Sequence, residues 1–168
     1  MARPRKTPDG LDFPYSHFGN PEARTQLLKD VAEALKLEPR VVVNVGSGYD
    51  ITPSDAFPEA RVIHTDIAPQ VVKFLIEAGF EAYEPQAMPR LEADLSMSIL
   101  GGDAYSVPLS PSGFVLSTSM YLPEEMGVVG LVDTSEPPNI VTDVSAMEEL
   151  WHRNEGRNVH LVASQKIN

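Results

Sequence analysis

The sequence predicts an α/β fold in which helices and strands alternate to form three layers around a mostly parallel sheet. Residues 40–45 form an apolar, β-branched run, which is typical of a strand buried on both faces of a parallel sheet. Amphipathic helical patterns stand before and after such runs in the first half of the chain. Pro and Gly, 15 and 11 of the 168 residues, cut the chain into short elements. Strands alternating with helices favour right-handed crossovers between parallel strands.

The first half of the chain is expected to supply two amphipathic helices and four strands, with a short segment around residues 54–60 between the first two strands, in a β-α-β-α order. Asn20 is a candidate N-cap and Pro21 suits the first helical position, where its missing N–H is not needed. Pro39 ends this helix, and Ala68-Pro69 opens the next one, with Gly79 just past its end. The strands expected here are 40–45, 61–66, a weak 81–84, and 93–100.

The second half has fewer helical patterns. We expect strands at 113–119, 127–133 and 158–164, and one helix at 145–154, where Ser145 and Glu148 form a capping box. The connection 101–112 holds two Pro and two Gly and is not expected to form a full helix. Residues 1–19 lack an apolar period and are expected to be an arm that is flexible or lies on a partner. Residues 20–168 are expected to form one domain.

Composition excludes several classes of protein. The formal charge of −11 disfavours nucleic acid as a partner, and it is also compatible with adaptation to high salt. Cys is absent, which excludes disulfides, thiolate metal sites and a Cys nucleophile. No apolar run approaches the length of a membrane span, and no apolar core follows the basic first six residues as in a signal peptide. We therefore expect a soluble, cytoplasmic protein.

A ligand site is expected at the end of the strand 40–45, because ligands of open α/β sheets bind beyond the carboxyl ends of the strands. Gly46 and Gly48 permit a tight turn and a close approach of the backbone to a ligand. Asp66 ends the next strand, where a carboxylate can accept hydrogen bonds from the hydroxyls of a ribose. Asp66 could also serve as an ordinary helix cap. Ile51 stands where a dinucleotide fingerprint needs its third glycine, which disfavours a nicotinamide-dependent reductase, and no P-loop occurs.

Two segments carry a resemblance to a known family. Residues 42–48 (Val-Val-Asn-Val-Gly-Ser-Gly) resemble the first motif of class I S-adenosylmethionine-dependent methyltransferases, and residues 62–69 (Val-Ile-His-Thr-Asp-Ile-Ala-Pro) resemble their second. The resemblance extends over about residues 20–168, and beyond residue 70 it lies in the order of the elements. It implies a Rossmann-like sheet of about seven strands, mostly parallel with an antiparallel last strand, and S-adenosylmethionine as the cofactor.

The resemblance also implies the residues of the cofactor site. Gly46 and Gly48 would pass under the methionine part, Asp66 would hold the ribose and Ile67 would lie against adenine. The substrate would be presented near Asp103 and Tyr105 in the loop after the fourth strand. The full set of expected cofactor-binding residues is Asn44, Gly46, Ser47, Gly48, Asp66, Ile67, Gln86 and Ala87.

The chain also departs from the family pattern. Asn44 stands where the family usually has an acid, and Gln86 replaces the acid that binds the adenine amino group. The amino-group methyltransferase motif is missing after the fourth strand, and the shortened connection that follows leaves one sheet face to be covered by a partner subunit or by the arm.

These departures leave an alternative open, which is a catalytically inactive module of the same fold with a structural or protein-interaction role. A loop Gly46–Asp50 collapsed onto Asp66, or a cleft filled by the arm, would favour that alternative. An open cleft with Asp66 pointing into it would favour cofactor binding.

Other polar residues are given structural interpretations. No histidine spacing suits a metal, and Asp50 and Asp55 are expected to be solvated loop acids. His64 lies inside an expected strand and is interpreted as a packing residue, and no Ser-His-Asp arrangement is apparent. Trp151 is expected in the core, and Glu148 with Glu149 on a solvated helix face.

Overall fold

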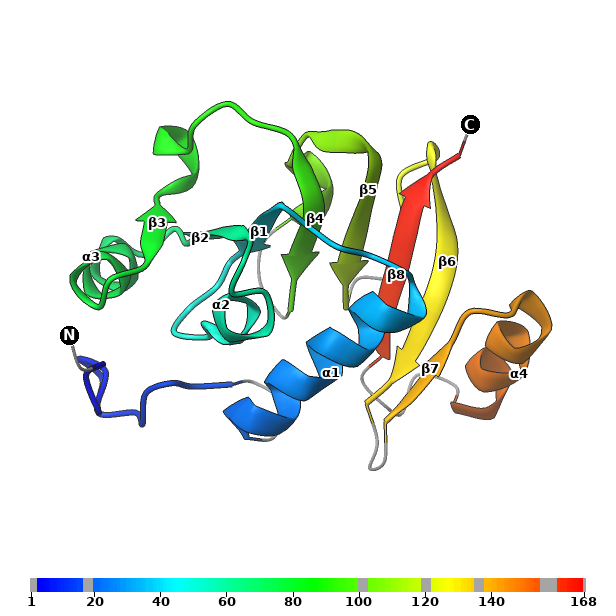
Figure 1. Cartoon of the computed structure of the whole chain (residues 1–168), viewed down its shortest axis with the longest axis horizontal. Coiled ribbons are helices and arrows are strands. Elements are labelled where there is room, and N and C mark those ends of the chain that lie inside the picture. Colours follow the sequence, from blue (N-terminus) through cyan, green and yellow to red (C-terminus); the bar gives the residue numbers. More distant parts are fainter. Residues whose placement is uncertain are drawn as a thin grey trace.

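A computed structural model describes residues 3–16, 20–99, 103–118, 122–134, 138–154 and 160–167. The elements run in the expected alternation through the first half of the chain (Figure 1). In chain order they are α1 (Pro21–Ala34), β1 (Val41–Val45), α2 (Thr52–Ala56), β2 (Arg61–Thr65), α3 (Pro69–Glu77), β3 (Glu81–Tyr83), the 3-10 turn η1 (Pro85–Ala87), β4 (Ala93–Ser98), the 3-10 turn η2 (Ala104–Ser106), β5 (Leu109–Ser117), β6 (Met126–Asp133), β7 (Asn139–Val141), α4 (Val144–Asn154) and β8 (His160–Lys166).

One sheet of eight strands in the order β3-β2-β1-β4-β5-β8-β6-β7 carries the fold. The five strands from β3 to β5 are parallel, whereas β8 runs antiparallel to both β5 and β6. The expected antiparallel last strand is therefore confirmed. The edge strand β7 was not expected from the sequence, because three residues are too few to show an alternating pattern.

The two long helices begin as their residue types dictate, with one correction. The Asn20 side chain accepts a hydrogen bond from the Ala23 N–H at 2.7 Å, so the expected cap of α1 is confirmed. For α4 the expected cap was Ser145, which is wrong. The Asp143 carboxylate accepts the Ala146 N–H at 3.1 Å and the helix begins at Val144, because a carboxylate placed just before the helix can reach this free N–H.

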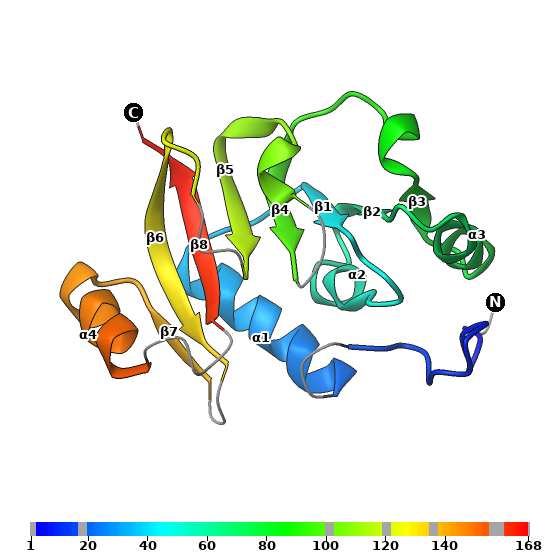
Figure 2. The same cartoon turned by 180° about the vertical axis from the view of Figure 1, so that it is seen from behind.

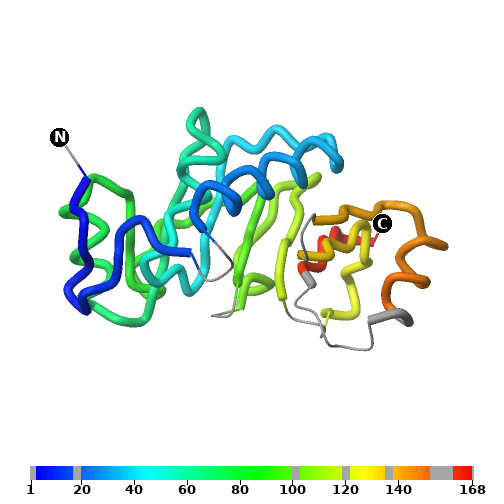
Figure 3. The backbone as a smooth tube through the Cα atoms, turned by 90° about the horizontal axis from the view of Figure 1, so that it is seen from below, coloured from blue at the N-terminus to red at the C-terminus, as the bar shows by residue number. Residues whose placement is uncertain are grey.

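The main core lies between α1, α2 and one face of the sheet. Leu28 on α1 and Leu95, Met97 and Leu116 on the strands are almost fully buried in one cluster. Figure 3 shows α1 and α2 on the same side of the sheet, with α4 at its far end. The aliphatic positions of the strands alternate with residues that face the opposite side, as the two-residue period of a strand requires.

On the opposite sheet face no long helix lies over β4 and β5 in the described part of the chain, whereas α4 packs on β8 and β6 (Figure 2). Over β1 and β4 the chain covers this face with its own loops, since Met88, Leu91 and Val107 pack against Val43 and Ala93. The small side chain of Ser96 is buried on the same face of the sheet. Its hydroxyl donates a hydrogen bond to the Ala104 carbonyl at 2.6 Å. Short loops thus replace part of the missing helical layer.

The arm, of which residues 3–16 are described, lies on the domain itself. Phe13 is 6% exposed and packs into a cluster with Val72, Leu75 and Ala82. Residues 1–2 and 17–19 of the expected arm lie outside the described residues. Among the described residues no helix combines the length and the apolar character needed to cross a membrane.

Candidate functional site

The loop after β1 is a tight turn held against the end of β2. Gly46 and Gly48 adopt positive φ values of 63° and 51°, a conformation that is strained for residues with a Cβ. Between them, the Ser47 N–H donates to the Thr65 carbonyl at 2.9 Å. The two expected glycines therefore shape a loop at the carboxyl edge of the sheet.

Asp66 joins this loop to α3. Its Oδ2 accepts the Gly48 N–H at 2.8 Å, and its Oδ1 accepts the Ala68 N–H at 2.9 Å, which is an Asx turn at the start of the helix. An ionised carboxylate has about four acceptor positions, so two hydrogen bonds leave about two for a ligand. Asp66 is half-buried, and its two contacts fix the direction of its carboxylate.

A polar network lies beneath the loop. Asn44 on β1 and His64 on β2 are register partners and both are buried. The Asn44 Nδ2 donates to the Asp50 carbonyl at 2.9 Å and lies 3.1 Å from His64 Nδ1. Because the carbonyl requires a donor, Nδ2 is the atom on this side, and His64 Nδ1 must accept from it. The Asn44 amide nitrogen thus braces the loop from inside.

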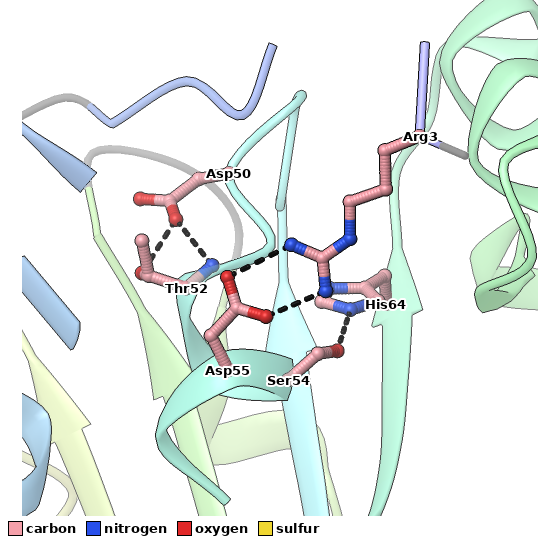
Figure 4. Close-up of polar contacts among 6 residues, drawn as sticks. All are labelled: Arg3, Asp50, Thr52, Ser54, Asp55 and His64. Atoms are coloured by element: carbon pink, nitrogen blue, oxygen red, sulfur yellow. Dashed lines mark hydrogen bonds and ion pairs between the residues drawn. The ribbon is translucent and has the colours of Figure 1, made fainter. Parts of the chain in front are cut away.

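The other ring nitrogen of His64 fixes the role of Ser54. His64 Nε2 lies 2.8 Å from Ser54 Oγ (Figure 4). With Nδ1 acting as an acceptor, Nε2 carries the proton and donates it to Ser54, so His64 cannot take the hydroxyl proton as a general base would. Burial lowers the pKa of His64 to about 4, which keeps the ring neutral. The hydrogen bond between His64 and Ser54 therefore has a structural role, which supports the interpretation of His64 as a packing residue.

Asp50, expected to be solvated, is instead 5% exposed, and its Oδ1 accepts from both the N–H and the hydroxyl of Thr52 (Figure 4). The expectation is wrong because the loop turns this carboxylate inward toward the start of α2. Arg24 of α1 is also buried, and its desolvation lowers the pKa of the guanidinium to about 10, while the negative charge of Asp50 opposes that shift.

The arm contacts the site from outside. Arg3 donates to both oxygens of Asp55 on α2, at 3.1 and 2.6 Å (Figure 4). The Tyr49 hydroxyl, in the glycine loop, donates to the Asp9 carboxylate at 3.1 Å. Asp55 is therefore paired with the arm rather than only solvated. These contacts place residues 3–16 beside the loop.

A groove of about 660 Å³ extends from the last residues of β1 and β2 to the loops that precede β4 and β5. Its lining includes Val45, Thr65 and Pro85, which directly precede the expected site residues Gly46, Asp66 and Gln86. The loops 88–92 and 106–108 form the rest of its described wall, and no described residue of the arm lines it. Its volume is within the range of small-molecule and cofactor sites.

The remaining expected residues lie at the surface of this edge or apart from it. Ile67 is 84% exposed, which is unusual for a large apolar side chain, and Gln86 and Ala87 in η1 are exposed as well. Asp103 caps η2 by accepting the Tyr105 N–H at 2.9 Å. The Tyr105 side chain packs in a cluster with Val115 and Met126, on the strands β5 and β6. The described residues contain no cluster of three or more metal-ligating side chains.

The sheet order, the antiparallel β8 and the glycine loop facing an acid after β2 define the fold of class I S-adenosylmethionine-dependent methyltransferases. The chain is similar in structure to a SAM-dependent methyltransferase from Geobacter sulfurreducens in complex with S-adenosyl-L-homocysteine, with 14% identity over 90% of this chain and 94% of that chain and a TM-score of 0.53.

Two other solved structures agree. A functionally unknown protein from Deinococcus radiodurans R1 is 15% identical over 91% of this chain and 90% of that chain, with a TM-score of 0.53. A 16S rRNA methylase is 14% identical over 87% of this chain and 63% of that chain, with a TM-score of 0.51. No protein-family model and no curated protein matches the sequence. At these identities the likeness establishes the fold.

Proposed function

We propose that the chain binds S-adenosylmethionine at the carboxyl edge of its sheet and transfers the methyl group to an acceptor. The observation that carries the proposal is the groove that begins at the ends of β1 and β2, where its wall includes the residues directly before Gly46 and Asp66. An acid after β2 whose carboxylate is fixed by the glycine loop suits the two hydroxyls of a ribose.

The residues of this edge fit the parts of the cofactor. Asp66 keeps acceptor capacity for the ribose, and the exposed Ile67 beside it offers an apolar surface to adenine, with Gln86 and Ala87 at its edge. The backbone of Gly46, Ser47 and Gly48 would hold the methionine part, and Asn44 would support that loop through its hydrogen bond to the Asp50 carbonyl. When bound, S-adenosylmethionine supplies a methyl group attached to a sulfonium sulfur, and this sulfur becomes a neutral thioether when the methyl group is transferred. The protein's contribution is to position the two reactants.

Asp66→Ala tests the proposal by isothermal titration with S-adenosylmethionine. We expect the wild-type chain to bind one equivalent, and the variant to bind at least about 100-fold more weakly, because two hydrogen bonds to a charged acceptor are lost. Asp143→Ala is a matched control, since it also removes a carboxylate that accepts a backbone N–H at a helix start, but at α4. Its affinity should stay within about twofold of wild type.

A second candidate function is that of a non-catalytic module of the same fold. It is favoured by the contact of the Gly48 N–H with Asp66 and by the use of the Asn44 amide inside the protein. Titration separates the two. Absence of both heat and a thermal shift at millimolar S-adenosylmethionine would reject the methyltransferase and leave the module.

A further inference from the structure

An apolar groove of about 410 Å³ lies between α4 and the strands β6 and β8. Met147 and Leu150 of α4 pack on Leu131 and Val162 and fix the helix to the sheet. Of the seven large apolar side chains that are exposed in the described part of the chain, three line this groove. They are Val128, Val144 and Trp151, which are 39%, 66% and 41% exposed. Trp151 was expected in the core, which is wrong, because its position on α4 faces the groove rather than the sheet.

One charged side chain stands among the described residues that line the groove. Glu148 follows Val144 by four residues and precedes Trp151 by three, so these residues share one face of α4. An apolar wall with a single carboxylate at an exposed position complements a small apolar molecule that carries a positive charge. The net charge of −11 also favours a cationic over an anionic ligand. A volume of this size suits a small molecule rather than a folded partner.

Part of the groove lies at the same end of the sheet as the proposed cofactor site. Val162, in its wall, is the register partner of Ser117, the last residue of β5. Three strand spacings, about 14 Å, separate β8 from β1. A cofactor laid from Asp66 after β2 across the glycine loop after β1 extends in this direction along the edge.

We propose that this groove binds the methyl acceptor, and that the acceptor is a small apolar molecule with a basic amino group, held with its ammonium near Glu148. The assignment as acceptor rests on the proposed function. In the transfer, the ammonium first loses a proton to solvent, and the nitrogen lone pair then forms a bond to the methyl carbon. The bond from that carbon to sulfur breaks with its electron pair staying on sulfur, and the new ammonium group keeps the positive charge.

Trp151 provides the readout, because it is the only tryptophan of the chain and lines the groove. The full chain is titrated with 2-phenylethylamine while tryptophan fluorescence is recorded. The uncharged 2-phenylethanol and the anionic 3-phenylpropanoate, which carry a similar apolar body, are titrated in parallel. We expect saturable fluorescence changes with the amine at the lowest concentrations, then the alcohol, and none with the carboxylate.

Two variants locate the charge effect. Glu148→Gln should weaken binding of the amine about fivefold and leave that of the alcohol unchanged, the size expected for one partly exposed ion pair. Glu149→Gln removes a negative charge from the next residue, which is also exposed but does not line the groove. It should change neither the binding of the amine nor that of the alcohol. Both positions are exposed on α4, so neither variant should impair folding.

The outcomes separate the groove from the cofactor site. Equal binding of the three probes, an equal effect of the two variants, or competition between the amine and S-adenosylhomocysteine would overturn the proposal. Self-association of the chain that is relieved by Trp151→Ser would also overturn it, because the groove would then be an interface. Selective amine binding without any binding of S-adenosylmethionine would reject the proposed function while retaining the amine site.

Discussion

Phe13→Ala is expected to lower the free energy of unfolding by about 3 to 4 kcal/mol, measured by urea denaturation, because a buried aromatic ring is removed from a packed cluster. Phe13 is 6% exposed. Its ring stands edge-on to Phe74, with centroids 5.1 Å apart, and to Phe80, at 6.2 Å. The arm is therefore expected to be part of the folded unit.

Leu11→Ala is the matched control, since it shortens an apolar side chain of the same arm that is 41% exposed. Its effect should stay below about 1 kcal/mol because little apolar area is lost. The account of the arm fails if Phe13→Ala costs no more than Leu11→Ala, because both residues would then be equally solvated.

Acid is expected to destabilise the chain through His64 by about 3 kcal/mol between pH 7 and pH 4. Burial depresses the pKa of His64 to about 4 in the folded chain, whereas the unfolded chain has the ordinary value of 6.5. As the pH falls below 6.5 the unfolded state gains a proton that the folded state does not, so the loss of stability begins there and is complete near pH 4.

Urea denaturation at several pH values measures this effect, with His64→Gln as the reference. The variant lacks the titrating ring. Between pH 7 and pH 4 its free energy of unfolding should therefore fall by about 3 kcal/mol less than that of the wild-type chain. The difference between the two chains cancels the contributions of carboxylates such as Glu81 and Asp94, whose pKa values are lowered by their partners. Parallel pH dependences would show that His64 is not buried as a neutral ring.

The sequence predicts most of the sheet because its central strands are apolar and β-branched. Val41–Val45 and Arg61–Thr65 lie within the expected ranges, since consecutive β-branched residues, Val41–Val43 in one strand and Val62 with Ile63 in the other, favour a buried strand. Strand β7, of three residues, is too short to show a period and was missed, and helix α2, of five, was expected only as a short segment around residues 54–60. Their formation depends on neighbours that are distant in the chain.

The position of Gly48 and Asp66 at the carboxyl edge of the sheet was predictable, because each residue follows a buried strand; their role toward a cofactor stays a prediction. The network of Asn44, His64 and Ser54 was not predicted, because it joins three separate segments. A signal for it exists in the sequence: Asn44 and His64 are polar residues that directly follow apolar, β-branched residues, each is the fourth residue of its strand, and a parallel register makes them neighbours.

A crystal structure of the full chain with S-adenosylhomocysteine tests the proposal that Asp66 holds a ribose at the carboxyl edge of the sheet. We expect both ribose hydroxyls within hydrogen-bond distance of the Asp66 carboxylate, with adenine against Ile67 and the rest of the molecule over the loop Gly46–Gly48. Electron density for the ligand at another place, or an edge without ligand at a saturating concentration, would contradict it.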